Sequence, residues 1–205
     1  TRFQRLVREL SHELKKNIDF QTEGTEIELD KNMIEGLIDP IMHIIRNSID
    51  HGIESPEERK KQGKSPHGII TFKAYYSGSN VYVQVADDGA GIDVNKIRKH
   101  AIEKGLIQPE TVLSSKEILD LIFLPGFSTA ETVTNISGRG VGMDVVKRKI
   151  ADLRGEINLE TRVHEGTTIT VKLPLTLSII DGLLVQIDDA YFVIPLSSVN
   201  KCFEF

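Results

Sequence analysis

The sequence predicts an α+β fold, in which helical segments alternate with short runs of strands. Three observations support this prediction. Apolar residues recur every three or four positions in several segments, which is typical of amphipathic helices. In other segments they alternate with polar residues, which is typical of strands with one buried face. From about Leu177 onward, short apolar runs are broken by Asp-Gly and Asp-Asp turns, with no helical pattern between them.

The composition limits the classes of function. The chain has 205 residues, a net charge of −5 and a single cysteine, Cys202. One cysteine excludes an internal disulfide and a cysteine-based metal cluster, and it fits a reducing, cytoplasmic setting. No apolar run approaches the roughly 20 residues that span a bilayer. The acidic balance argues against nucleic acid, so the sequence predicts neither a nucleic-acid partner nor direct membrane insertion.

The N-terminal part begins with a predicted amphipathic helix over residues 1–16, which we expect to continue a longer helical element. Residues 20–29 contain Gly24 and alternating apolar residues, which predict a hairpin or a pair of short strands. Asp30 is placed to cap a helix over about residues 31–51. Ser55 and the following proline start a short charged helical turn.

The segments that follow alternate between strands and helices. Ile70, Phe72 and Ala74 share one face of a predicted strand, and a strand of alternating valines follows it. Further segments are helices over 93–104, 114–123 and 143–153, and strands over 156–161 and 167–173. Residues 126–142 form a long polar loop of the kind that serves as a functional lid or is disordered. We expect residues 129–139 to be mobile without a ligand.

The predicted helix over residues 31–51 has an unusual polar face. His43, Arg46, Asn47, Asp50 and His51 fall within an arc of roughly 140°, at about 100° per residue. The opposite side is isoleucine-rich. Solvated faces usually carry Lys and Glu, whereas this one carries residue types that ligate metals and contact phosphates. A solvated face and a ligand site are both compatible with the pattern.

An aspartate lies on the core side of the valine-rich strand. Asp87 has the same strand parity as the apolar residues before it. A buried carboxylate costs several kcal/mol unless something donates hydrogen bonds to it. The chain then turns through Gly89 and Gly91. Asp87 either bonds the local backbone of a turn or accepts a hydrogen bond from a ligand amine at the mouth of a pocket.

A second glycine cluster, SGRGVGMDVV, places Gly138, Gly140 and Gly142 before a helix. Backbone amides at a helix N-terminus bind phosphate. The cluster is neither a Walker A loop nor a Rossmann fingerprint, and a flexible loop before a capped helix is the alternative. Thr167 has the parity of the apolar residues after it, so its hydroxyl faces the core, either packed there or in contact with a ligand.

The order of these motifs resembles the nucleotide-binding boxes of the GHKL superfamily, which includes histidine kinases, Hsp90, gyrase B and MutL. The resemblance covers about residues 20–175. It implies a Bergerat-type two-layer α/β sandwich, with a mixed sheet, helices on one face, and ATP between helices and lid. More narrowly, HIIRNSIDHGIE, GRGVGMDVV and GTTITVKLPLTLSIIDGLLV resemble the CheA family of chemotaxis histidine kinases.

The narrower resemblance implies three parts. Residues 1–18 would be the end of a helical dimerisation element, and residues 19–176 the ATP-binding kinase domain. Residues 177–205 would be the start of a truncated β-barrel regulatory domain of the CheW type. The implied partners are a phosphoacceptor histidine domain of the same protein, response regulators, a CheW-type coupling protein with chemoreceptors, and a second copy through the helical element. The implied location is cytoplasmic, in receptor-associated complexes at the membrane.

The resemblance also implies residue roles. Asn47 would hold the Mg²⁺ that bridges the phosphates of ATP, and Asp87 would accept from the adenine amine. Phe123 and Phe127 would form the phenylalanine box, and Thr167 would lie near the base through a water. The implied nucleotide-contacting set is Asn47, Asp50, His51, Asp87, Gly89, Gly91, Ile92, Lys96, Phe127, Ser128, Gly138, Arg139, Gly140, Val141, Gly142, Met143 and Thr167.

His43 departs from the superfamily pattern. The hydrolysing relatives carry a glutamate four positions before the asparagine, where it activates water. A neutral imidazole can instead contact an incoming histidine or take its proton. His43, with Asn47 as the second catalytic residue, therefore favours phosphoryl transfer to a histidine. The alternatives are a GHKL ATP hydrolase and a nucleotide-gated interaction module.

Overall fold

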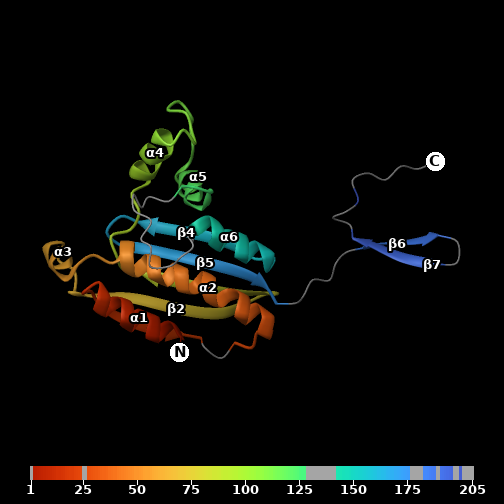
Figure 1. The fold of residues 1–205 in the computed structure, drawn as a ribbon, viewed down its shortest axis with the longest axis horizontal. Coiled ribbons are helices and arrows are strands. Elements are labelled where there is room, and N and C mark those ends of the chain that lie inside the picture. Colours follow the sequence, from red (N-terminus) through yellow and green to blue (C-terminus); the bar gives the residue numbers. More distant parts are fainter. Residues whose placement is uncertain are drawn as a thin grey trace.

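A five-stranded mixed sheet and a separate two-stranded sheet make up the strands of the computed structural model, which describes residues 2–24, 27–127, 142–175, 182–187, 190–195 and 199 (Figure 1). The larger sheet has the order β1-β2-β3-β5-β4, with β1 parallel to β2 and the other neighbours antiparallel. Its strands are β1 Asn17–Glu23, β2 His67–Ser77, β3 Asn80–Asp87, β4 Glu156–Arg162 and β5 Gly166–Pro174. The helices are α1 Arg2–Glu13, α2 Lys31–Asn47, η1 Ser48–Gly52, α3 Pro56–Lys61, α4 Val94–Glu103, α5 Ser115–Asp120, η2 Leu121–Phe123 and α6 Met143–Asp152.

The main core lies between one face of this sheet and helices α1, α2 and α6 (Figure 1). β3 alternates strictly between partly exposed and buried positions, as its sequence predicts. The buried sheet residues include Ile70, Val81, Val83, Val85, Ile169, Val171 and Leu173. Burying each such side chain contributes about 1.5–3 kcal/mol, so this face fixes the helices above it. A smaller second core joins α4 and α5 through Ile97, Ala101, Ile118 and Phe127.

The predicted fold class is confirmed, since a mixed sheet carries helices on one face. The parallel pairing of β1 and β2 requires a long crossover, which α2, η1 and α3 provide. Helix α2 begins where predicted, because the Asp30 carboxylate accepts a hydrogen bond from the backbone N–H of Asn32 at 2.8 Å. Ser55 and Ser114 cap α3 and α5 with complete capping boxes.

The predicted hairpin over residues 20–29 is wrong. β1 is a single strand, Asn17–Glu23, and residues 27–30 form no strand. The backbone of Glu28 takes its partner from a side chain instead: its N–H donates to the Tyr76 hydroxyl at 3.0 Å, and its carbonyl accepts from that hydroxyl at 2.8 Å. A segment whose polar groups are satisfied in this way needs no second strand.

The predicted helix over residues 31–51 changes type near its end. It is α-helical to Asn47 and continues as the π-helical turn η1, which the backbone bond from Ile53 N–H to Ser48 O closes at 2.8 Å. Single π-turns inside helices occur frequently at functional sites. The wider turn alters where the last polar residues of this helix point.

The long polar loop falls almost entirely at residues 128–141, outside the described residues, as does the predicted mobility of residues 129–139. Toward the C-terminus, β6 Gly182–Ile187 and β7 Ala190–Pro195 pair antiparallel in their own sheet. Their assignment to a β-barrel domain stays a prediction. No helix within the described residues is long and apolar enough to span a membrane.

Candidate functional site

The end of strand β3 carries a buried carboxylate. Asp87 is 9% exposed, and its Oδ1 accepts hydrogen bonds from the backbone N–H of Gly89 at 3.1 Å and of Thr167 at 3.3 Å. The Ser48 hydroxyl from η1 also bonds to this carboxylate. Burial raises the pKa of Asp87, and these three hydrogen bonds oppose the rise. The carboxylate is therefore held in one orientation where η1, β3 and β5 meet.

Glycines surround this carboxylate because backbones meet there at close range. A Cβ at Gly89 would lie 2.1 Å from the carbonyl oxygen of Gly52. A Cβ at Gly166, where φ is +111°, would lie 1.9 Å from the carbonyl oxygen of Asp87. Gly91 has φ +68°, and its Cβ would meet the Arg162 carbonyl at 2.1 Å. At each of these positions a side chain would clash with the protein's own backbone, so the close backbone packing by itself requires glycine.

Two threonine hydroxyls connect the carboxylate region to the loop after β3. Thr167 is buried, as its parity predicts, and its hydroxyl lies 3.0 Å from that of Thr161. The Thr161 hydroxyl accepts a hydrogen bond from the backbone N–H of Ile92 at 2.9 Å. The hairpin of β4 and β5 thus holds the loop that follows Asp87.

The polar face of α2 meets the start of α6. The side-chain amide of Asn47 donates to the sulfur of Met143 at 3.1 Å. His43, one turn earlier, is half-buried. Burial lowers the pKa of His43, the charges of Arg46 and His51 lower it further, and Asp144 of α6 opposes them. The imidazole is therefore neutral at pH 7 and can accept a proton.

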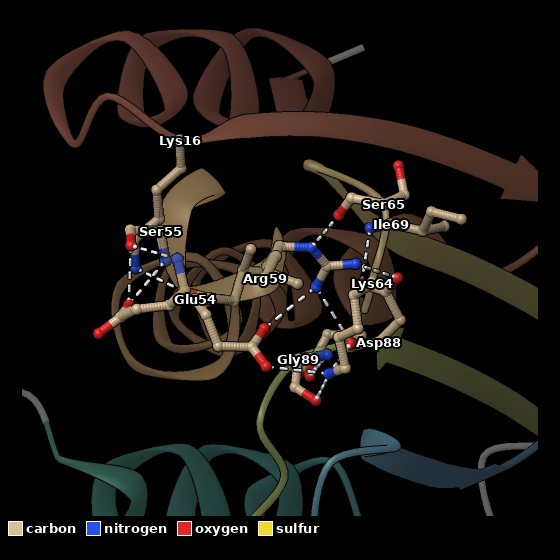
Figure 2. A network of polar contacts seen from close by, with 12 residues as sticks. Lys16, Glu54, Ser55, Arg59, Lys64, Ser65, Ile69, Asp88 and Gly89 are labelled. Carbon is tan, nitrogen blue, oxygen red and sulfur yellow. Dashed lines mark hydrogen bonds and ion pairs between the residues drawn. The ribbon is translucent and has the colours of Figure 1, made fainter. Parts of the chain in front are cut away.

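A buried ionic network supports the loop from its other side. Arg59, only 1% exposed, donates from Nη2 to Asp88 Oδ2 at 2.7 Å and from Nη1 to Glu54 Oε2 at 3.1 Å. The Lys64 ammonium donates to Glu54 Oε1 at 2.9 Å and to the carbonyl oxygens of Asp88 and Gly89 at 2.9 and 2.7 Å. Figure 2 shows Arg59 between Glu54 and Asp88, with Lys64 beside them. The network fixes the backbone of Asp88 and Gly89, directly after the site carboxylate.

Residues 36–177 match the family of histidine kinase-, DNA gyrase B- and HSP90-like ATPases. The chain belongs to this family. The buried carboxylate, the polar end of α2 and the start of α6 all lie within the residues that match this family.

Relatives of this ATPase domain have names from bacterial chemotaxis. It is 50% identical over 199 residues to the chemotaxis protein CheA of Borreliella burgdorferi, covering 97% of this chain and 23% of that protein. It is 50% identical over 200 residues to the sensor histidine kinase CheAY of Helicobacter pylori, covering 97% and 25%. It is 47% identical over 201 residues to CheA of Bacillus subtilis, covering 97% and 30%. The chain thus spans less than a third of the length of these three relatives.

A solved structure supports the fold alone. The mycobacterial sensor histidine kinase MprB matches with a TM-score of 0.52 at 16% identity, over 84% of this chain and 92% of that one.

The structure brings together only part of the predicted nucleotide-contacting set. Asp87, Gly89 and Thr167 are in direct contact, and Asn47 contacts Met143. Gly142 precedes α6 as its N-cap. Ile92 joins the cluster through Thr161. Nucleotide contacts of all these residues stay predictions.

Other predicted residues lie apart from the Asp87 cluster. Asp50 and His51 are exposed on the π-turn, and Lys96 is exposed on α4. Phe127 is 1% exposed in the second core, with its ring 5.4 Å from that of His100, and Phe123 is buried in the main core. The predicted contacts Ser128, Gly138, Arg139, Gly140 and Val141 lie outside the described residues.

Sequence reasoning missed Ser48, Gly52 and Arg59. It also missed Lys16, whose ammonium donates to the carbonyl oxygens of Ile49, Asp50 and Ile53. A signal for Ser48 was present, because at 100° per residue it falls within the isoleucine stripe of its helix, as Asp87 falls within the valine stripe of its strand. The long cationic side chains of Arg59 and Lys16 gave no signal, because such residues are nearly always exposed.

The depressed pKa of His43 predicts a pH dependence of stability. The unfolded chain takes up a proton near the usual histidine pKa of 6.5, whereas folded His43 resists protonation. Stability therefore rises with pH across the window from the lowered folded pKa up to about 6.5. We expect the loss of stability between pH 7.5 and 5.5 to be smaller in His43→Gln than in the native chain, as measured by urea unfolding. Equal losses in both proteins would contradict the assignment.

Proposed function

We propose that this ATPase domain is the ATP-binding catalytic domain of a chemotaxis histidine kinase. It would transfer the γ-phosphoryl group of Mg-ATP to a histidine on a separate domain, for relay to response regulators. The observation that carries the proposal is the buried Asp87 carboxylate. An ionised carboxylate offers about four acceptor positions, and two backbone amides and the Ser48 hydroxyl occupy three of them. The remaining acceptor position suits the exocyclic amine of adenine.

The polar end of α2 supplies groups for the phosphates. The described residues hold no cluster of three or more His, Cys, Asp or Glu side chains that could bind a metal by itself. That fits Mg²⁺, which is usually held by one or two side chains together with substrate phosphates. Asn47 is the residue we assign to this role. When bound, Mg²⁺ neutralises charge that develops on the phosphates.

His43 supports transfer over hydrolysis. Its imidazole is half-buried and neutral at pH 7 because burial lowers its pKa. A neutral imidazole can accept a hydrogen bond from the incoming histidine or take its proton, whereas the glutamate implied at this position in hydrolysing relatives activates water. We assign His43 and Asn47 as the catalytic pair.

The remaining assignments follow the names of the relatives. We propose that the domain acts in the cytoplasm, in complexes with a CheW-type coupling protein and chemoreceptors. Residues 1–18 would belong to a dimerisation element, and residues 177–205 would begin a CheW-like β-barrel. The identities to CheA and CheAY proteins over 97% of the chain support these proposals.

A transfer assay tests the proposed function. The chain is mixed with γ-labelled ATP, Mg²⁺ and the phosphoacceptor domain of the same protein, and labelled protein and free phosphate are both followed. We expect label on the acceptor that survives alkali but not acid, as phosphohistidine does. His43→Gln is expected to lower the transfer rate by about 100-fold, the scale of a proton-transfer group, while ATP binding persists. Free phosphate alone would indicate a hydrolase, and bound ATP with neither product would indicate an interaction module.

A further inference from the structure

Lys16 lies at the junction of α1 and β1, where the backbone is held in a defined turn. Helix α1 ends in a Schellman motif: Lys15 has φ 52°, its N–H donates to His12 O at 3.4 Å, and the Lys16 N–H donates to Ser11 O at 3.0 Å. This motif ties the residue after the left-handed position to the last turn of the helix. The backbone of Lys16 therefore has a fixed position relative to the end of α1.

The side chain of Lys16 reaches the π-turn η1. Its ammonium donates to the carbonyl oxygens of Ile49 at 2.7 Å, Asp50 at 2.8 Å and Ile53 at 2.7 Å. All three ammonium donors are thus used on backbone acceptors. Helix ends leave carbonyls without intrahelical partners, and a cation at a helix C-terminus is favourable. Figure 2 shows the Lys16 side chain extending from the junction of α1 and β1 toward the segment that carries Glu54 and Ser55.

The same π-turn contacts the candidate nucleotide site on its other side. The Ser48 hydroxyl bonds the Asp87 carboxylate, and a Cβ at Gly52 would lie 3.1 Å from Asp87 Oδ2. The carbonyl of Gly52 accepts a hydrogen bond from the Ala90 N–H at 2.9 Å. A shift of η1 therefore changes the position of the hydroxyl and backbone that hold Asp87.

Beside Lys16, α1 and β1 are not in close contact along their whole length. A groove of about 650 Å³ separates them, with Val7, Ser11, Asn17 and Phe20 among its lining residues. Leu10 of α1 is buried in the main core, and Lys16 adds polar contacts from the end of α1 to the π-turn region. The acidic groups whose charges act on Lys16 are Asp50, Glu54 and Glu58.

We infer that Lys16 is a positioning residue that couples the C-terminal end of α1 to the nucleotide site by holding the π-turn next to Asp87. The inference rests on the proposed ATP site. A movement of the end of α1 relative to the sheet pulls on two carbonyls of η1 and on that of Ile53 directly after it, and alters the support of Asp87. Any partner that repositions α1 thereby changes nucleotide affinity.

Replacement of Lys16 in the 205-residue chain tests the coupling. Lys16→Met keeps the stem and removes the donors. We expect its Kd for Mg-ATP to rise about 10-fold, the scale of a coupling residue, and the Ile53 and Ala90 amides to exchange faster with deuterium, because their acceptors lie on η1. Leu159→Ala, a core variant on edge strand β4, serves as a destabilised control and should leave both readouts unchanged.

Restoring the ammonium provides a rescue. Cys202 is the only native cysteine, so Lys16→Cys is made in a Cys202→Ser background and alkylated with 2-bromoethylamine. The thiolate displaces bromide, which leaves an ammonium at the length of lysine. We expect affinity and amide protection to return. Failure of this rescue, or equal effects in Leu159→Ala, would reduce Lys16 to a general contributor to stability and overturn the inference.

A matched pair at position 15 tests the link to α1. Lys15→Val places a β-branched residue at φ 52°, which is strongly disfavoured, and is expected to reproduce the Lys16→Met effects, whereas Lys15→Met is not. Unchanged exchange in both Lys16→Met and Lys15→Val would refute the coupling. If the native chain fails to bind Mg-ATP, the proposed function falls, and amide exchange still decides whether Lys16 holds η1.

Discussion

Asp87→Asn is expected to fold and to lose about 3 kcal/mol of ATP binding, or about 100-fold in Kd. The asparagine carbonyl can still accept from the amides of Gly89 and Thr167, because both reach the same oxygen, Oδ1. The new amide group can donate to the Ser48 hydroxyl, which accepts as well as donates. It cannot accept from adenine, so two donors would face each other inside the site.

Calorimetry with Mg-ATP measures the affinity, and urea unfolding measures the fold. Because burial raises the pKa of Asp87 above its usual 3.8, the ionised form costs stability once the pH exceeds the folded pKa. The asparagine variant removes that cost, so its free energy of unfolding at pH 7 should equal or exceed that of the native chain.

Asp88→Asn is the matched control. Asp88 points to the opposite face and pairs with Arg59, so this variant should lose stability and keep most of its ATP affinity. The adenine assignment would be contradicted if Asp87→Asn bound ATP with native affinity. It would also be contradicted if both variants lost affinity only in proportion to their loss of stability.

The sequence predicted the burial of Asp87 correctly, because strand alternation is a local property. Three valines are buried at every second position of β3. The next residue with the same parity, Asp87, therefore faces the core as well. Thr167 on β5 followed the same logic, and β3 and β5 pair so that these two residues face each other. Where one buried face fixes the register, sequence alone shows which polar residue faces the core.

The glycines and the π-turn could not be predicted in this way. Gly89 is required because the backbone of Gly52, far away in the sequence, lies against it. That contact exists only once α2 crosses over the sheet. The turn η1 breaks the 3.6-residue period, and its carbonyls find a partner in Lys16 from another element. Local patterns carry no information on such long-range partners.

Arg59→Met is expected to destabilise the chain by about 3–5 kcal/mol, the cost of breaking a buried ion pair. All five guanidinium N–H groups have acceptors: Glu54, the Asp88 carboxylate, and the carbonyl oxygens of Ser65, His67 and Asp88. Methionine fills part of the volume and satisfies none of them. The Glu54 carboxylate then loses its ion pair with residue 59 and keeps the one with Lys64. Its negative charge stays buried with less electrostatic compensation.

The expected fall in melting temperature is about 10 °C, since each kcal/mol shifts it by about 2–4 °C in a chain of this size. Arg59→Lys should recover only part of this loss, because an ammonium offers three donors and cannot span the five acceptors.

Arg162→Met is the control, because the Arg162 side chain is 81% exposed and its ion pair with Glu165 lies at the surface. Equal melting temperatures for Arg59→Met and Arg162→Met would show that the network adds no net stability. Because Arg59 and Lys64 bond the backbone of Asp88 and Gly89, directly after Asp87, the same variant should also weaken ATP binding, whereas Arg162→Met should not.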